Sequence, residues 1–552
     1  MLDGLAVLYG AWIEPHNLRE NRCMTTRRQF LTSAGALIAA SSASIQGCSG
    51  GGEGGLTTVP APPPSAPPSN VVGPAWFGFG RDAQHSSVGA IATQSLDRIL
   101  WQTPVDTAPT YSGSALLAHY GSPVITSKNT VIVGVKTSST GGFRLEARTG
   151  TIGSLVWSGP SDHVPPSGSN WFPSFNLVLT SANRLYAPGA GGRLWMRNDA
   201  DSVSDLLQSV TFFGSAAYDS APSAFNASVF INTPLTADAA GNVYFGFVVT
   251  GSNPANLRSG IARITPTGTG SWVSASAAAQ DPGIAKVATN SAPALSNDGR
   301  TLYVLVGDAP LSGFIPGGRL LALDAATLTT QASVRLIDPA SGTPAWVNDN
   351  GTASPMVGSD GDVYVGVLEA NPPSHHFTGW LLHFNANLSQ TKIPGAFGWD
   401  NTPSVVPASM VPAYTGPSSY LLLSKYNNYK QAGGDGGNRV AILDPNQSQA
   451  DKILGTTVMK EVMTQLGPTS DPANPGGVTE WCINVAAVDP STRSVLMNNE
   501  DGYLYRWDLG ANTLSQRLRL NSGVGQAYTP TIIGPDGAVY SINNAVLVVA
   551  GR

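Results

Sequence analysis

Acidic, amide and aromatic residues recur just before a series of short apolar segments, most of which open with Ser-Pro, Thr-Pro or Ala-Pro. If these segments are the inner strands of a ring of sheets, the residues before them converge on the mouth of a central channel. Carboxylates and tryptophans at such a mouth are costly unless they are paired or hold a ligand. The candidate ligand-binding residues at the mouth are His119, Trp171, Asp349, Asn350, Trp399, Asp400, Asn401, Glu480, Trp481 and Tyr528.

The amide and acidic residues among these positions also have a purely structural interpretation. Asn and Asp side chains satisfy backbone groups in tight turns, which would account for residues such as Asn232 and Asn290 without any ligand. No Gly-x-Ser-x-Gly elbow, His-Glu-x-x-His or paired-carboxylate motif stands out, so a hydrolase or lyase has no specific support. An active site assembled from distant loops would escape a motif search, and catalytic residues therefore stay unknown.

Three long loops are predicted to open on the same face as the channel mouth. They are polar and cover residues 247–260, 367–379 and 424–438. Long loops on a rigid scaffold commonly carry function. The binding candidates within the last of these loops are Lys425, Tyr426, Asn427, Asn428 and Asp435.

Two features of these loops could hold a metal ion, but each has a simpler interpretation. His375 and His376 could bind zinc together with His383, yet neighbours in an extended chain point to opposite sides, so we expect surface residues. The Gly-Gly-Asp-Gly-Gly stretch, residues 433–437, has one carboxylate and matches neither a P-loop nor an EF-hand. We expect a mobile loop there, and metal ligands stay unknown.

A repeated unit must position these residues. From residue 118 onward the chain repeats a short apolar strand, a turn with Gly or Asp-Gly, a strand with Val-Tyr or Leu-Tyr, a loop and an alternating strand. Asp-Gly supplies the positive φ that hairpin turns need. A four-stranded sheet of this kind cannot bury both faces alone, so the units must stack radially. The eight units begin at Ser122, Pro173, Thr233, Ala292, Ser354, Thr402, Asn484 and Thr529.

The two ends of the repeat region are predicted to pair. The last unit ends at Val546–Val549 without an outer strand, whereas Arg98–Val105 is an orphan strand before the first unit. Pairing them closes the ring and removes the free edges. The predicted fold class is all-β: an eight-bladed β-propeller of four-stranded antiparallel blades, closed by an N-terminal strand on the C-terminal blade.

An insertion between residues 445 and 480 interrupts the repeat. Its apolar residues fall at helical spacing, so we predict one short helix packed on the rim, with a partner-binding helix as the alternative. The residues that define this spacing are Val458, Met459, Val462, Met463 and Leu466.

Two segments resemble a known family. Trp76–His85 resembles the segment that precedes the first blade in PQQ-like β-propeller proteins, and Leu321–Thr327 resembles their repeat signature. The resemblance covers roughly residues 73–552 and implies an eight-bladed fold. It does not imply the quinone, because the family includes cofactor-free scaffolds such as the propeller lipoprotein of the outer-membrane assembly machinery.

The resemblance also implies what a quinone enzyme would need. Quinone dehydrogenases of this family clamp pyrroloquinoline quinone (PQQ) between a tryptophan and a disulfide of adjacent cysteines, and coordinate Ca²⁺ with Glu, Asn and Asp. This chain has no adjacent cysteines, and only Cys482 lies in the body. No cofactor is therefore assigned, and PQQ with Ca²⁺ belongs to the alternative interpretation.

Composition agrees with short strands joined by turns. The chain has 552 residues, including 62 Gly and 41 Pro, and only 12% are charged. This composition suits β-structure better than helices. The formal net charge of -5 gives no basic footprint, so no nucleic-acid partner is predicted.

The first residues predict export. Arg27 and Arg28 precede a moderately apolar run, residues 34–43, which is too short to span a membrane, and Cys48 follows a small residue. This pattern resembles a twin-arginine signal that ends in a lipobox. We predict lipidation at Cys48. The next residue is Ser49 and not the Asp that resembles an inner-membrane retention signal. In a Gram-negative host this favours the periplasmic side of the outer membrane.

The predicted domain organisation has four parts. Met24 lies just before the arginine pair, so residues 1–23 are predicted to come from a start codon assigned too early. Residues 24–47 form the signal, and residues 48–72 form a Gly-rich and Pro-rich disordered linker. Residues 73–552 form the propeller.

The sequence thus predicts a monomeric, lipid-anchored propeller of the cell envelope. It would bind a ligand or an envelope protein through its loop-rich face. The alternative is a PQQ-dependent, quinoprotein-like oxidoreductase with its site at the central channel. Twin-arginine export implies folding before translocation, often around a cofactor, which mildly favours a bound ligand.

Overall fold

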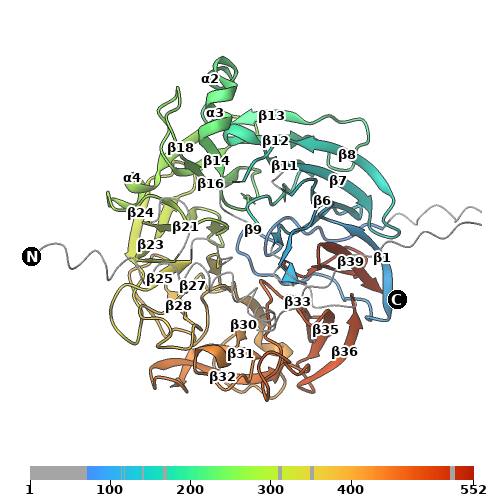
Figure 1. Ribbon diagram of the computed structural model, residues 1–552, viewed down its shortest axis with the longest axis vertical. Helices are drawn as coiled ribbons and strands as arrows, with labels where there is room; N and C mark the ends of the chain where they lie inside the picture. The colour runs from blue at the N-terminus through green and yellow to red at the C-terminus, as the bar shows by residue number, and fades with distance from the viewer. Residues whose placement is uncertain are drawn as a thin grey trace, which may run out of the picture.

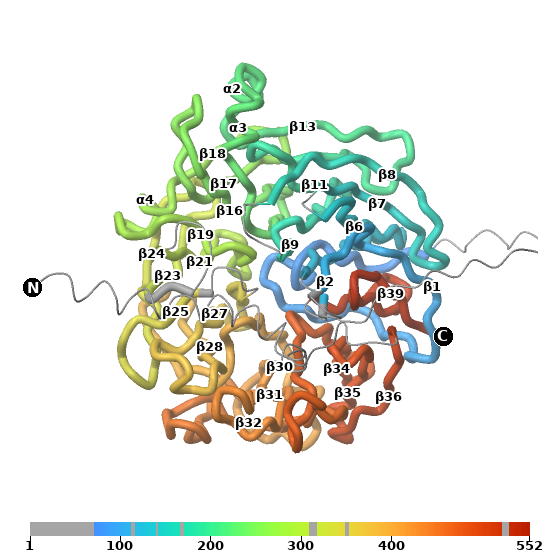
Figure 2. The backbone as a smooth tube through the Cα atoms, viewed as in Figure 1, coloured from blue at the N-terminus to red at the C-terminus, as the bar shows by residue number. Residues whose placement is uncertain are grey.

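Eight sheets form a ring in the computed structural model, and the chain passes once around it from the blue N-terminal blade to the red C-terminal one (Figures 1 and 2). The structure describes residues 71–112, 115–116, 118–139, 142–165, 171–308, 314–348, 353–521 and 529–552. The predicted eight-bladed β-propeller is confirmed. The predictions for the signal, Cys48 and the linker lie outside the described residues.

The first four blades each run from an inner strand outward, with antiparallel neighbours in sequence order. Their strands are β5 (Val124–Ile125), β6 (Thr130–Lys136), β7 (Phe143–Thr149) and β8 (Leu155–Ser161); β10 (Val178–Leu179), β11 (Leu185–Pro188), β12 (Arg193–Arg197) and β13 (Gln208–Thr211); β14 (Val229–Ile231), β15 (Thr236–Ala237), β16 (Val243–Val249), β17 (Gly260–Ile264) and β18 (Gly270–Ser274); and β19 (Lys286–Val287), β20 (Ala294–Leu295), β21 (Thr301–Gly307), β23 (Gly318–Asp324) and β24 (Thr330–Arg335).

The last four blades follow the same order, and β1 supplies the outer strand of the eighth. Their strands are β26 (Met356–Val357), β27 (Val363–Val367) and β28 (Trp380–Phe384); β29 (Ser404–Pro407), β30 (Tyr420–Tyr426), β31 (Arg439–Ala450) and β32 (Thr457–Leu466); β33 (Ala487–Asp489), β34 (Ser494–Asn498), β35 (Tyr503–Asp508) and β36 (Thr513–Arg519); and β37 (Ile532–Ile533), β38 (Val539–Asn543), β39 (Val546–Gly551) and β1 (Arg98–Pro104).

Short elements connect or decorate the blades. Among the described residues, no helix is long and apolar enough to cross a membrane. The short elements are the strand pairs β2 (Tyr111–Ser112) with β3 (Ala115–Leu116), β4 (His119–Tyr120) with β9 (Trp171–Phe172) and β22 (Phe314–Pro316) with β25 (Trp346–Asn348), the helices α2 (Ser215–Ser220), α3 (Pro222–Ser228) and α4 (Ala275–Ala279), and the 3-10 turns η1 (Ala190–Gly192), η2 (Ala408–Met410) and η3 (Lys430–Ala432).

The Asp-Gly turns form as predicted between inner and second strands. Gly299, Gly361 and Gly537 have φ values of 71°, 91° and 80°, which L-residues with side chains rarely adopt. Each donates its N–H to a carbonyl three residues earlier, at 2.9, 3.0 and 2.9 Å respectively. These turns lie on one side of the ring, the turn face, whereas the loops between second and third strands open on the other side, the loop face.

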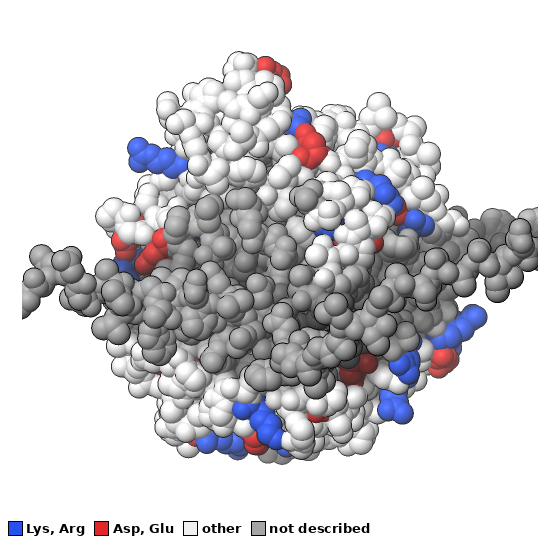
Figure 3. All heavy atoms as spheres, viewed as in Figure 1, with Lys and Arg blue, Asp and Glu red and all other residues white. Residues whose placement is uncertain are grey.

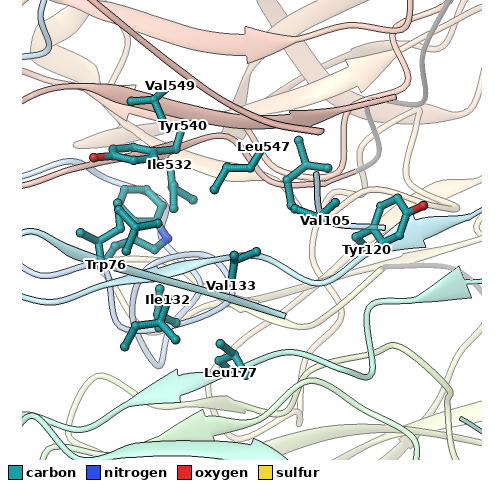
Figure 4. Packing of buried hydrophobic residues seen from close by; sticks show 14 of the residues in the cluster. Trp76, Val105, Tyr120, Ile132, Val133, Leu177, Ile532, Tyr540, Leu547 and Val549 are labelled. Carbon is teal, nitrogen blue, oxygen red and sulfur yellow. The ribbon is translucent and has the colours of Figure 1, made fainter. Parts of the chain in front are cut away.

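The predicted closure of the ring is confirmed. β1 pairs antiparallel with β39, with Trp101 opposite Val549 and Thr103 opposite Leu547. Figure 4 shows the packing beside this seam, where Leu547 from the last blade and Val133 from the first belong to one buried cluster. Inner and middle strands are almost wholly buried, while the outer β36 alternates exposed and half-buried residues.

A belt, residues 74–94, joins the blades on the turn face. It runs across the inner strands in chain order, and in six blades it bonds to the second residue of the inner strand. The backbone bonds are Trp76 N–H to Ile125 O (2.9 Å), Leu179 N–H to Phe77 O (2.7 Å), Leu295 N–H to Ala83 O (2.7 Å), Val357 N–H to Gln84 O (2.9 Å), Val405 N–H to Ser86 O (3.0 Å) and Val488 N–H to Ser87 O (2.9 Å).

Blade 5 departs from the prediction of four strands, because its described sheet contains only β26, β27 and β28. A long hairpin from blade 6 packs against it instead: Met459 N–H donates to Pro394 O at 2.7 Å, and Val458 lies in the apolar cluster of Trp380 and Phe384. The hairpin comprises the ends of β31 and β32.

The predicted helix between residues 445 and 480 is wrong, because its apolar residues lie in strand β32. Two irregularities shift the register between β31 and β32, one of them between Asp444 and Ser448. Bulges of this kind break the two-residue alternation of a strand. The resulting spacing of Val458, Met459, Val462 and Met463 imitates a helical period.

Candidate functional site

The residues that lead into the inner strands form a ring of hydrogen bonds between blades. Asn290 has a φ of 67°, and its Oδ1 accepts from the backbone of Ser174, while Asn232 Nδ2 donates to Val287 O at 2.9 Å. The structural interpretation therefore holds for these two amides. The blade-to-blade bonds are Ser122 N–H to Asn176 Oδ1 (2.5 Å), Ser174 N–H to Asn290 Oδ1 (3.0 Å), Asn290 N–H to Asn232 O (2.8 Å), Ala292 N–H to Ser354 Oγ (2.9 Å), Ser354 N–H to Thr402 Oγ1 (2.9 Å), Ser404 Oγ to Ala486 O (2.7 Å), Thr531 N–H to Val485 O (3.1 Å) and Thr529 Oγ1 to Tyr120 O (3.2 Å).

A buried ion pair lies at the loop-face ends of the inner strands of blade 6. Lys425, near the end of β30, places its Nζ 2.6 Å from Asp400 Oδ1, and the two side chains are 1% and 2% exposed. The ammonium also lies 5.6 Å from the ring centre of Phe397 and 5.9 Å from that of Trp399. Aromatic faces stabilise a cation at such distances, so Lys425 is held by both charge and rings.

Three further polar groups of blade 7 lie around this pair. Glu480 and Cys482 precede β33, Glu500 follows β34, and all three are buried. Burial raises the pKa of the Cys482 thiol well above its usual value, and the Glu500 carboxylate raises it further, against the opposing effect of Lys425. The thiol is therefore protonated and a poor nucleophile. This group of Asp400, Lys425, Glu480, Cys482 and Glu500 is called the charge group below.

The predicted mouth residues do not all share one role. Trp481 is fully buried, with its ring edge-on to Tyr505 at 5.6 Å, and Trp399 packs in a cluster with Phe397 and Tyr429. Both tryptophans therefore pack in the protein interior. Asn401 Nδ2 donates to Ser424 Oγ at 3.1 Å, within blade 6.

His119 and Trp171 come together on the other side of the ring. They stack with ring centres 4.0 Å apart and lie opposite each other in the parallel pair β4 and β9, which joins blades 1 and 2. The remaining candidates Asp349, Asn350 and Tyr528 lie outside the described residues.

Four of the five loop candidates, Tyr426, Asn427, Asn428 and Asp435, line a cavity, and Lys425 does not. Its volume is about 190 Å³, and it lies between blades 5 and 6, beneath the tip of the long hairpin. Lys425 and Tyr426 belong to β30 and precede the loop. Asn427 exchanges hydrogen bonds with the backbone of Trp481, at 3.0 and 3.1 Å, which ties the loop to blade 7. The cavity is lined by Thr378, Ala396, Tyr426, Asn427, Asn428, Asp435, Gly437, Arg439, Asp451, Lys452 and Ile453.

The expectation that the histidines are surface residues is wrong for His375 and His383, which are fully buried. His375 stacks on Trp380 at 3.9 Å, and its Nε2 lies 3.2 Å from Asp451 Oδ2 in the hairpin tip. The chain is not extended here, because His376 has a φ of 54°, so neighbouring side chains need not point to opposite sides.

The other two histidines also contact polar side chains of the protein. His376 Nδ1 lies 2.8 Å from Asn428 Oδ1, and His383 Nε2 lies 2.9 Å from Asp362 Oδ2. No group of three or more His, Cys, Asp or Glu side chains that could hold a metal ion occurs within the described ranges.

Sequence reasoning missed Glu500, Asp451 and Arg439. Glu500 lies in the loop between second and third strands of blade 7, so the rule that selected loop 424–438 would have found it. Asp451 could not be placed, because the hairpin that carries it was predicted as a helix.

On the face drawn in Figure 3, charged side chains of both signs lie in small separate groups around the rim.

Similar known proteins support the fold and do not distinguish a specific function. No family model matches the sequence, and no curated protein matches it. Similar solved structures include a europium-containing methanol dehydrogenase, with 9% identity and a TM-score of 0.50 over 84% of this chain and 88% of that chain. Two others are BamB from Moraxella catarrhalis (13% identity, TM-score 0.41, 78% and 93% covered) and a quinohemoprotein alcohol dehydrogenase from Comamonas testosteroni (12%, 0.48, 87% and 77%). These neighbours are β-propeller proteins, and at such identities the likeness concerns the fold alone.

Proposed function

We propose that the chain is an exported, lipid-anchored β-propeller of the cell envelope that binds a ligand or an envelope protein through its loop face. The observation that carries the proposal is the charge group around Asp400 and Lys425. Burying an ion pair adds little net stability, because desolvation offsets the Coulombic attraction. Charges kept buried at the centre of a loop-rich face therefore support a role in binding.

The cavity between blades 5 and 6 also supports the loop face as the binding surface. Its lining residue Tyr426 directly follows Lys425 of the charge group in β30. Separate stretches of chain from blades 5 and 6 form its walls, and a rigid ring positions all of them. Loops held in this way are the usual place for a binding site.

The proposed lipid tether would join the propeller on its turn face, which lies opposite the loop face. Gly73 N–H donates to Ser127 O at 2.9 Å, in the turn between β5 and β6, so the chain reaches the propeller on its turn face. A lipid on Cys48 would then turn the loop face away from the membrane, toward the periplasm in a Gram-negative host.

Metabolic labelling with an alkyne fatty acid tests the anchor. We expect label on the wild-type chain and its loss in Cys48→Ala, because no other cysteine is placed to become the mature N-terminus. Cys23→Ala is the matched control and should keep the label. Label that persists in Cys48→Ala would remove the anchor from the proposal.

The alternative, a PQQ-dependent oxidoreductase, fits the described residues poorly. Cys482 is a free, buried thiol, and the ring of Trp481 packs against Tyr505 with no exposed face. Together with the lack of a three-ligand metal group in the described part of the chain, these residues do not form the clamp and Ca²⁺ site that the quinone enzymes use.

Reconstitution separates the two functions. The purified chain is incubated with PQQ and CaCl₂, passed through a desalting column, and examined for bound quinone absorbance and for dye-linked oxidation of ethanol. The proposal predicts neither. Stoichiometric retention of PQQ, lost in Asp400→Asn, would favour the oxidoreductase.

A further inference from the structure

The cavity between blades 5 and 6 has charged walls, and most of its charges are already paired. Asp451 Oδ2 accepts the N–H groups of Ile453 and Leu454 at 2.9 and 2.6 Å and lies against His375. Lys452 Nζ donates to Glu461 Oε2 at 2.7 Å. These groups line the cavity, and their charges are already paired within the protein.

Arg439 is different. It is the first residue of β31 and lies opposite Tyr426 in the register, so the two side chains share the sheet face that lines the cavity. It is half-buried, and its guanidinium has no hydrogen bond or ion pair with any described residue. A guanidinium presents a rigid fork of donors that matches a carboxylate. An unpaired one in a cavity is therefore suited to an anionic ligand.

Asp435 adds an acceptor at the rim of the same cavity. Its Oδ1 accepts from Asn428 Nδ2 at 3.0 Å and from Gly437 N–H at 2.7 Å, which fixes the orientation of the carboxylate. Its Oδ2 accepts no hydrogen bond from the described residues. That oxygen would repel a second anionic group but would accept the hydroxyl of a ligand.

The volume limits the size of the ligand. About 190 Å³ has room for roughly six water molecules, each taking about 30 Å³. This suits an acid of three or four carbons.

We propose that this cavity binds a small hydroxycarboxylate, with the carboxylate on Arg439 and a hydroxyl on Asp435. The inference rests on the proposed binding function of the loop face and names a ligand class for it. No covalent step is involved.

Titration calorimetry of the full chain with sodium glycerate, sodium propionate and sodium phosphate tests the ligand class. We expect saturable binding of glycerate, with propionate weaker by about tenfold, because it lacks the hydroxyl that meets a charged acceptor. Equal affinity for glycerate and propionate, no binding of glycerate, or tighter binding of phosphate would each overturn the proposal.

Variants then test the residue. Arg439→Gln should weaken glycerate binding by about ten- to a hundredfold, the usual effect of losing charge-assisted hydrogen bonds, whereas Arg439→Lys should keep part of it. Arg300→Gln is the matched control, since that side chain is 85% exposed, and it should bind as wild type does. Unchanged thermal unfolding shows that the variants fold, and glycerate affinity unaltered in Arg439→Gln overturns the assignment.

Failure of this inference can be told from failure of the proposed function. If glycerate does not bind, yet the chain isolated from its host carries another ligand or a partner, the hydroxycarboxylate assignment falls and the binding function stands. If neither is found, both fall.

Discussion

Lys425 and Asp400 are almost completely buried, so at the scale of single residues each charge depends on the other. Removing one partner of a buried pair removes its Coulombic attraction and leaves the desolvation cost of the other charge. We expect Asp400→Asn to lower the free energy of unfolding by about 3–5 kcal/mol in urea titrations.

The control for this variant is Asp298→Asn. The Asp298 side chain is 62% exposed, so its replacement should change the free energy of unfolding by less than about 0.5 kcal/mol. An Asp400→Asn variant as stable as wild type would show that the pair is not the buried interaction described above.

His85 in the belt predicts a dependence of stability on pH. Burial lowers its pKa from 6.5 to about 4, against the hydrogen bond between its Nδ1 and Pro355 O, at 2.7 Å. Between these two values the unfolded chain binds a proton that the folded chain does not. The contribution of His85 to stability is therefore full above pH 6.5 and falls by about 3 kcal/mol as the pH drops to about 4.

Urea unfolding of wild type and His85→Asn across this range measures the effect. Asn tolerates the φ of 61° found at this position and keeps a donor for Pro355 O. We expect a shallower loss of stability in the variant between pH 6.5 and 4. Identical slopes would mean that His85 is not buried in its neutral form.

At the scale of elements, strand β32 offers a direct check of the correction to the predicted helix. Val458 is fully buried against blade 5, whereas Val462 is only partly buried. Val458→Ala should cost about 2 kcal/mol of stability, from lost methyl groups and the cavity they leave. Val462→Ala, the same change four residues on, should cost clearly less, and equal losses would favour the helical arrangement.

The elements also show what sequence reasoning could and could not reach. Repetition and Asp-Gly turns such as Asp298-Gly299 determine local structure, so the blades and the seam at β1 followed from them. The bulge after Asp444 involves Ser418, whose Oγ accepts from Asn446 Nδ2 at 2.9 Å, and no local pattern contains a contact with a residue so distant in the sequence. For the same reason Trp481 was selected for its position in sequence, although packing against Tyr505 places it in the interior.

At the scale of the whole molecule, the belt joins blades on opposite sides of the ring. Phe79 packs with Ala292 from blade 4 and Val485 from blade 7. Phe79→Ala should therefore open a cavity at the centre and lower stability by about 3–5 kcal/mol, measured by urea unfolding. Phe77→Ala, at a half-buried position of the same belt, is the control and should cost less. Equal costs would contradict a central role for Phe79.

The proposed function to be tested is binding of a ligand or an envelope protein through the loop face of this propeller. Native mass spectrometry of the chain, extracted in mild detergent from its own host, tests it most directly. We expect a monomeric propeller that begins at a lipidated Cys48 and carries a small ligand or a protein partner without PQQ. A mass that contains PQQ with Ca²⁺ would contradict it.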